Sequence, residues 1–245
     1  MGYEAIDGED SHGKGKKNKA GNTDKLDSSL SRTKAKIFEL AMCNDWENFV
    51  TLTLNPEYHD RSDLNHYKRK LSTWIKNYNR LQNINIKYLL IPEEHKDGNW
   101  HMHGLIMGLP TEYLREFTTY EKLPLKMLTE ITKGNTLYDW PAYAKAFGYL
   151  SISKIRNAES VSKYITKYIT KNLLRTRISL NDHLYYASQG LKRAEIIYKG
   201  QLTKDFEEDF GNEYVKIKTL RTFDEAIQYF TDDSYSPSDT KPEME

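Results

Sequence analysis

Two histidines, His101 and His103, stand two positions apart inside an apolar run of the 245-residue chain. Side chains of a β-strand alternate between its two faces, so both imidazoles would share one face while Met102 points into the core. Imidazoles this close can share one divalent ion. Because the same pattern occurs as an exposed pair of strand histidines with no metal, it predicts a metal site only together with other motifs.

A third ligand is expected from the strand that precedes the histidines. That strand ends at Glu93-Glu94, and after a turn containing Gly98 the chain returns from Trp100, so the two strands should pair antiparallel. One carboxylate could then face the same ion as the histidines, whereas His95 lies nearer the turn and is a weaker candidate. The residues alone leave the choice between Glu93 and Glu94 open.

Tyr164 and Tyr168 stand four positions apart, which is one turn of a helix, and Lys163, Lys167 and Lys171 form a basic row along the same helix. Tyrosines at this spacing are most often core residues. Beside a basic row, however, they favour a phosphate-binding surface. A phenol has a pKa near 10, and a lysine three positions on would favour the reactive phenolate. A metal pair with a tyrosine pair indicates cleavage and rejoining of a nucleic-acid backbone through a protein-linked intermediate.

Composition is that of a soluble globular protein, with 29% charged and 38% hydrophobic residues. No apolar run is long enough to cross a membrane, so no membrane partner is expected. The only cysteine, Cys43, can form no internal disulfide, which fits the cytoplasm. Residues 205–245 hold 12 acidic and 4 basic side chains, and since the whole chain carries +1, the remainder carries +9. A basic body with an acidic tail suits a polyanionic partner.

The order of predicted elements indicates an α+β fold with a central, mainly antiparallel sheet flanked by helices. The Gly- and Lys-rich residues 1–28 are expected to form a disordered basic arm, and residues 233–245 a disordered acidic tail. One domain is expected over 29–232, with an extension from about 205 and an irregular stretch over 123–141. Periodicity predicts strands at 46–54, 84–91, 100–109, 149–155, 183–187 and 214–220, and helices at 29–42, 62–81, 161–174 and 224–230.

Three segments, in this order, resemble the motifs of the HUH endonuclease superfamily, in particular the two-tyrosine rolling-circle replication initiators of phages and plasmids. The first is the strand Phe49-Val50-Thr51-Leu52-Thr53, and the second is His101-Met102-His103. The third is a helix with Tyr-x-x-Lys twice, at 164–167 and 168–171. A further segment, residues 185–192 (Tyr-Tyr-Ala-Ser-Gln-Gly-Leu-Lys), is similar to one in phage replication proteins. The resemblance covers about residues 46–200.

The resemblance implies a role for each candidate residue on an HUH nuclease domain with an RRM-like palm. His101, His103 and an acidic residue of the preceding strand would hold Mg²⁺ or Mn²⁺, and spacing favours Glu93 unless a β-bulge brings in Glu94. Tyr164 and Tyr168 would be the nucleophiles, and Lys167 and Lys171 would contact phosphate. Lys163, Thr51 and Thr53 are expected to face the DNA.

The implied activity is the nicking and rejoining of single-stranded or hairpin origin DNA in the cytoplasm of a bacterial host. A 5′-phosphotyrosine link and a free 3′-OH would form, which would start and end rolling-circle replication. No Gly-x-x-x-x-Gly-Lys-[Ser/Thr] motif is present, so we expect a host helicase as well as a host polymerase. The alternatives are a relaxase or transposase of the same superfamily, a non-haem metal oxygenase, and a non-catalytic nucleic-acid-binding module.

Overall fold

The structure is a computed structural model that describes residues 20–157, 161, 164, 184–195, 197, 198, 200–211, 216–218, 220 and 222–230, with residues 20–30, 210 and 211 described by backbone only. None of the helices in these ranges combines the length and the apolar character that crossing a membrane requires.

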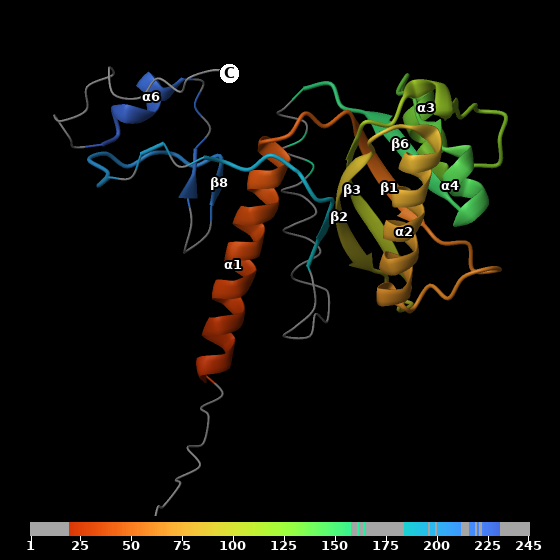
Figure 1. Ribbon diagram of the computed structural model, residues 1–245, viewed down its shortest axis with the longest axis horizontal. Helices are drawn as coiled ribbons and strands as arrows, with labels where there is room; N and C mark the ends of the chain where they lie inside the picture. Colours follow the sequence, from red (N-terminus) through yellow and green to blue (C-terminus); the bar gives the residue numbers. More distant parts are fainter. Residues whose placement is uncertain are drawn as a thin grey trace, which may run out of the picture.

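A seven-stranded antiparallel sheet forms the centre of the fold, with the strand order β4-β5-β6-β1-β3-β2-β7. Helices pack on both of its faces (Figure 1). The predicted α+β class with a mainly antiparallel sheet is therefore confirmed. The strands are β1 (Asn48–Thr53), β2 (Lys87–Glu94), β3 (Trp100–Met107), β4 (Arg115–Glu116), β5 (Tyr138–Asp139), β6 (Leu150–Lys154) and β7 (Tyr186–Ala187).

One face of the sheet packs against α2 (Leu64–Gln82) and α4 (Pro141–Ala146), as Figure 1 shows. Asp63 caps α2 by accepting a hydrogen bond from the main-chain N–H of His66, at 2.8 Å. The apolar stripe of this helix buries Tyr67, Leu71 and Ile75, with Tyr67 almost fully enclosed. The hydroxyls of Tyr67 and Tyr143 lie 2.6 Å apart inside this core. Burial raises the pKa of both phenols well above the ordinary value, so these two tyrosines stay protonated and structural.

The opposite face packs against α1 (Ala20–Met42), which lies on the other side of the sheet in Figure 1. Ile37, Leu40 and Ala41 of α1 meet Leu89 and other apolar residues of the central strands. This helix begins nine residues before the predicted start at 29, so residues 20–28 are helical and not part of an irregular arm. Val161 and Tyr164 have helical backbone and join the same apolar cluster, so these two residues also lie on this face.

The stretch that we expected to be irregular contains α3 (Leu125–Thr132) and β5, and β4 precedes it. That prediction was wrong because these elements are short. The two-residue strand β4 pairs with β5, and β5, also of two residues, pairs with β6. Local periodicity does not reveal such pairing. Beyond β7, a second, two-stranded antiparallel sheet consists of β8 (Phe210–Gly211) and β9 (Lys216–Ile217). The short helix α6 (Phe223–Ile227) follows it. One 3-10 turn lies earlier in the described chain, at Thr111–Tyr113.

Gly104 of β3 allows the neighbouring strand β2 to approach closely. A Cβ at this position would lie 2.0 Å from the main-chain oxygen of Leu89 and 2.9 Å from Cα of Leu90. These are backbone atoms, so rotating a side chain cannot relieve the overlap. We expect Gly104→Ala to lower the free energy of unfolding by about 3 kcal/mol, the upper part of the usual range for overpacking.

Gly98→Ala is the control for this prediction. A Cβ at Gly98 would have no atom within 4 Å, so this substitution meets no steric overlap. It should lower the free energy of unfolding only through the strain of its φ of +77°, by about 1 kcal/mol. Urea unfolding of both variants measures the difference. Equal costs would contradict the close approach at Gly104.

Candidate functional site

The pairing of β1, β3 and β2 places the candidate metal ligands on one face of the sheet. Thr51 lies opposite His103, and Thr53 lies opposite His101. On the other side of β3, Glu93 lies opposite His101. Residues that face each other across a strand pair point to the same side. All five side chains therefore lie on the face that α1 covers.

Each histidine is held by a threonine of β1 through its Nδ1 atom. Oγ1 of Thr53 lies 2.8 Å from Nδ1 of His101, and Oγ1 of Thr51 lies 3.1 Å from Nδ1 of His103. Both imidazoles are thus oriented with Nε2 pointing away from β1. Thr51 and Thr53 were predicted to face DNA, and the structure gives their hydroxyls this contact with the histidines.

Glu93 contacts the second histidine of the pair directly. Its Oε2 atom lies 2.7 Å from Nε2 of His103, whose residue is only 9% exposed. Glu94 lies opposite Trp100 and on the other face. Of the two carboxylates that the residues left open, the structure therefore brings Glu93 to the histidines.

Arg61, from the loop between β1 and α2, reaches the first histidine of the pair. Its Nη2 atom lies 3.0 Å from Nε2 of His101. The loop is fixed there because the main-chain N–H of Trp100 donates to the carbonyl of Arg61, at 2.9 Å. His95 stacks on His101, with ring centres 3.9 Å apart. Sequence reasoning did not include Arg61, since no motif or spacing connects it to the histidines.

These contacts show which ring nitrogens carry a proton. A guanidinium only donates, so Nε2 of His101 accepts from Arg61 and its Nδ1–H donates to Thr53. A carboxylate only accepts, so Nε2–H of His103 donates to Glu93. The hydroxyl of Thr51 can pair with Nδ1 of His103 in either role, because a hydroxyl both donates and accepts.

The donor set suits a divalent cation in its chemistry, with two imidazoles and one carboxylate on a shared face. Its present arrangement is not an assembled cage, because within the described residues no three His, Cys, Asp or Glu side chains are grouped closely enough to hold an ion. The guanidinium of Arg61 faces the Nε2 lone pair of His101, and Nε2 of His103 is bonded to Glu93. A cation would have to displace both contacts.

The surroundings of His101 keep its imidazole neutral. Burial and, after it, the nearby His95, Arg61 and His103 together lower its pKa to about 4, while Glu93 acts in the opposite direction. A neutral imidazole is the form that binds metals. At neutral pH a proton therefore does not compete with a cation for Nε2 of His101.

Tyr164 lies over β1 on the face of the histidines. Its ring packs on Phe49, with centres 4.2 Å apart, and its hydroxyl donates to the main-chain carbonyl of Val50, at 3.1 Å. Phe49 and Thr51 are neighbours on this face of β1, about 7 Å apart along the strand. The phenol is therefore beside the Thr51–His103 pair, but its proton is held by the backbone.

A cavity of about 590 Å³ opens beside Tyr164, toward the β6 side of the sheet. Three cationic side chains line it, Lys126, Lys154 and Arg156, and all three are exposed. The one carboxylate in its lining, that of Glu130, is bonded to Lys133 and Asn135. An anionic strand could therefore approach Tyr164 from this side. The other predicted residues of this helix, Lys163, Lys167, Tyr168 and Lys171, lie outside the described residues.

Comparison with known proteins gives one family. The model of the family described as "Replication-associated protein ORF2/G2P" matches residues 47–173, just over half of the chain. The match contains every candidate metal ligand and both candidate nucleophiles. No curated protein and no solved structure gives a match.

The low pKa of His101 predicts how acid affects the metal-free protein. Between about pH 6.5 and 4 the unfolded chain binds a proton at this residue that the folded chain does not. The free energy of unfolding should therefore fall as the pH is lowered through this window. We expect His101→Gln, which cannot titrate, to show a shallower fall in urea unfolding with chelator present. Parallel pH curves for the two proteins would contradict the lowered pKa.

Proposed function

The chain belongs to the family of replication-associated proteins ORF2/G2P, and from this premise we propose that it nicks and rejoins single-stranded DNA to initiate and terminate rolling-circle replication of a phage or plasmid. We further propose that it does so as a two-tyrosine HUH endonuclease. One observation carries the proposal. The threonines of the first motif, the histidines of the second and Tyr164 of the third lie together on one face of the sheet.

The proposed step is a transesterification at phosphorus. The oxygen of Tyr164 or Tyr168 attacks the scissile phosphate, and the bond from phosphorus to the 3′ oxygen breaks. The phenol loses its proton and the 3′ oxygen gains one, so the products are a 5′-phosphotyrosine and a free 3′-OH. No water is consumed, so the link can be reversed to rejoin the strand. A second tyrosine allows another cleavage while the first remains occupied.

His101, His103 and Glu93 would hold Mg²⁺ or Mn²⁺, and when bound the ion would polarise the scissile phosphate. Thr51 and Thr53 orient the two imidazoles, as outer-shell hydrogen-bond partners of metal ligands commonly do. Arg61 would leave His101 as the ion binds. Its guanidinium is already at the site, and its buried Nε has no hydrogen-bond partner among the described residues, so it would then lie where a phosphate oxygen can accept from it.

The rival functions are less well supported. A non-haem oxygenase usually carries its ligands on a double-stranded β-barrel, whereas these histidines lie on a central strand of an open sheet. A relaxase or transposase would share the proposed chemistry and differ in its DNA partner. A non-catalytic DNA-binding module would bind DNA without forming a covalent adduct, which the following experiment distinguishes.

The nucleophile assignment is tested with single-stranded origin DNA and Mn²⁺ on a denaturing gel. We expect a covalent protein–DNA adduct that chelator prevents. Tyr164→Phe and Tyr168→Phe should each reduce turnover, because one nucleophile is lost, but neither should abolish it, because the other nucleophile remains. The double variant should form no adduct, since phenylalanine has no oxygen to attack phosphorus. Tyr67→Phe, which changes a buried tyrosine on the opposite face, is the matched control. A persistent adduct in the double variant would refute the assignment.

The orienting role of Thr53 is tested by Mn²⁺ binding alone, measured by electron paramagnetic resonance. We expect Thr53→Val to weaken Mn²⁺ binding about 10- to 100-fold, because valine has the same shape but cannot bond Nδ1 of His101. Thr53→Ser keeps the hydroxyl and should retain most of the affinity. If the Thr53→Val and Thr53→Ser variants bind Mn²⁺ equally well, the hydroxyl of Thr53 does not orient His101 for metal binding.

A further inference from the structure

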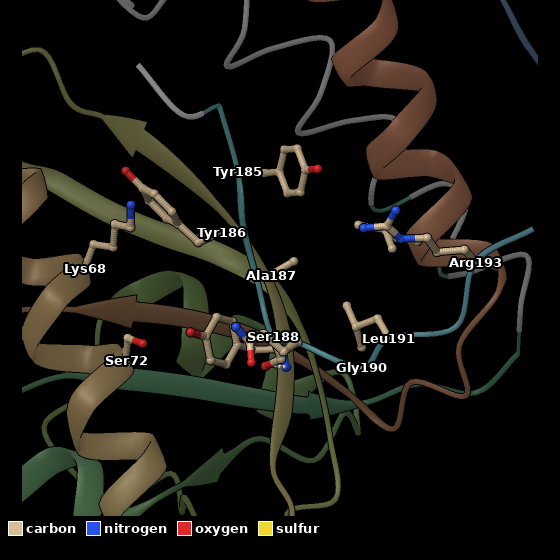
Figure 2. A pocket seen from close by; sticks show the side chains of 12 residues that line it. Lys68, Ser72, Tyr185, Tyr186, Ala187, Ser188, Gly190, Leu191 and Arg193 are labelled. Carbon is tan, nitrogen blue, oxygen red and sulfur yellow. Dashed lines mark hydrogen bonds between the residues drawn. The ribbon is translucent and has the colours of Figure 1, made fainter. Parts of the chain in front are cut away.

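The segment 185–193 takes no part in the site above, although part of it is similar to a segment of phage replication proteins. Together with α2 it borders a cavity of about 580 Å³ (Figure 2). The residues that line this cavity include two cations, three tyrosines and no carboxylate. The cations are Lys68 and Arg193, and the tyrosines are Tyr88, Tyr185 and Tyr186.

Hydrogen bonds hold this segment in place, in addition to the burial of Tyr186 in the core. Ser188 and Tyr88 are joined twice, from Ser188 N–H to the carbonyl of Tyr88 and from Tyr88 N–H to the hydroxyl of Ser188, at 3.0 and 2.9 Å. The side chain of Asn44 accepts from the main-chain N–H of Lys192 and donates to its carbonyl, at 2.8 and 3.0 Å. The segment is therefore a fixed wall that presents polar and aromatic side chains to solvent.

The cationic groups of the cavity lie on both sides of this wall. Figure 2 shows Lys68 with Tyr186 on the α2 side and Arg193 on the α1 side. Nζ of Lys68 lies 4.6 Å from the ring centre of Tyr186. In the described part of the chain neither Lys68 nor Arg193 is paired with a carboxylate. Their charges are available to a polyanion, and Tyr185 offers a partly exposed ring between them.

The cavity lies in line with the candidate site across the sheet. Ala187 of β7 pairs with Leu89, and continuing this register places Tyr185 beside Ile91, which pairs with His103. Two strand spacings separate β7 from β3, about 10 Å. Tyr185 is thus on the face of the histidines. The basic cavity beside Tyr164 lies on the opposite side of them, toward β6.

We propose that the cavity between α2 and the segment 185–193 binds the unpaired DNA strand on one side of the cleaved phosphate. Tyr185 provides a stacking surface for a base, and Lys68 and Arg193 contact phosphates, which is the combination that single-strand-binding grooves use. The inference rests on the proposed function for its ligand. It adds a DNA-binding site that is separate from the candidate metal ligands and the candidate nucleophilic tyrosines.

The charge contribution is tested by binding of fluorescent oligothymidines of increasing length, from about 4 to about 16 nucleotides. Chelator is present, so no chemistry occurs. We expect the wild-type affinity to rise once the strand is long enough to reach the cavity. Lys68→Ala with Arg193→Ala should lose about tenfold or more of this gain, and the slope of log affinity against log salt should fall by about 1.4, for two lost phosphate contacts.

The matched control is Lys76→Ala with Arg80→Ala, which removes one lysine and one arginine from exposed positions of α2 outside the cavity. It should retain the length-dependent gain. Equal losses in the two double variants, or unchanged DNA affinity in the cavity variant, would overturn the proposal. Unchanged affinity would also be the result if the cavity served a protein partner.

The stacking contribution is tested with Tyr185→Phe and Tyr185→Ala. The Tyr185→Phe variant should bind the long oligothymidine as tightly as the wild type does, and the Tyr185→Ala variant should bind it about tenfold more weakly. Equal binding by both would refute stacking at Tyr185, and if the alanine variant does not fold, the charge variants decide. Covalent adduct formation, measured separately with Mn²⁺, distinguishes failure of the nicking proposal from failure of this site.

Discussion

The register of β1, β3 and β2 is the constraint on which the candidate site depends. Because faces alternate with a period of two, a shift of β3 by one residue would turn His101 and His103 toward the core of α2 and expose Met102. The Thr–His hydrogen bonds exist only in the observed register. Gly104, one residue after His103, lets β2 approach closely enough to bring Glu93 to that histidine.

Much of this face could be predicted from the sequence, and the reason is alternation. The period of two in β1 and β3 assigns the threonines and histidines to one side without tertiary knowledge. Choosing Glu93 over Glu94 needed the register of the β2–β3 hairpin, which depends on the turn at residues 95–99. Arg61 could not be predicted, because its position depends on one main-chain bond to Trp100 from a loop distant in sequence. The protons on Nδ1 of His101 and Nε2 of His103 likewise depend on which donors and acceptors meet in space.

Other differences follow from elements that owe their form to neighbours. β4, β5 and β7 have two residues each. β5 and β7 form beside the longer strands β6 and β2, which offer unpaired backbone groups, and β4 in turn pairs with β5. A period cannot be detected over two residues. The helix α2 was predicted within two residues at its N-terminus, because its apolar stripe runs for five turns and Asp63 caps it. Length of the periodic signal therefore separates the elements that sequence can predict from those that it cannot.

Both halves of the proposed chemistry are held in a resting arrangement by groups that a DNA strand and an ion would displace. The phenol of Tyr164 keeps its proton while it donates to the carbonyl of Val50. Nε2 of His101, the nitrogen that would bind the proposed ion, accepts a hydrogen bond from Arg61. Each contact is a single hydrogen bond, with a net value of about 1 kcal/mol between the neutral groups and about 1.5–3 kcal/mol for the guanidinium. That is small against the electrostatic gain from binding a phosphate among cationic side chains. Under the proposed mechanism, the site would become reactive only when strand and ion are both present, which would limit unproductive attack.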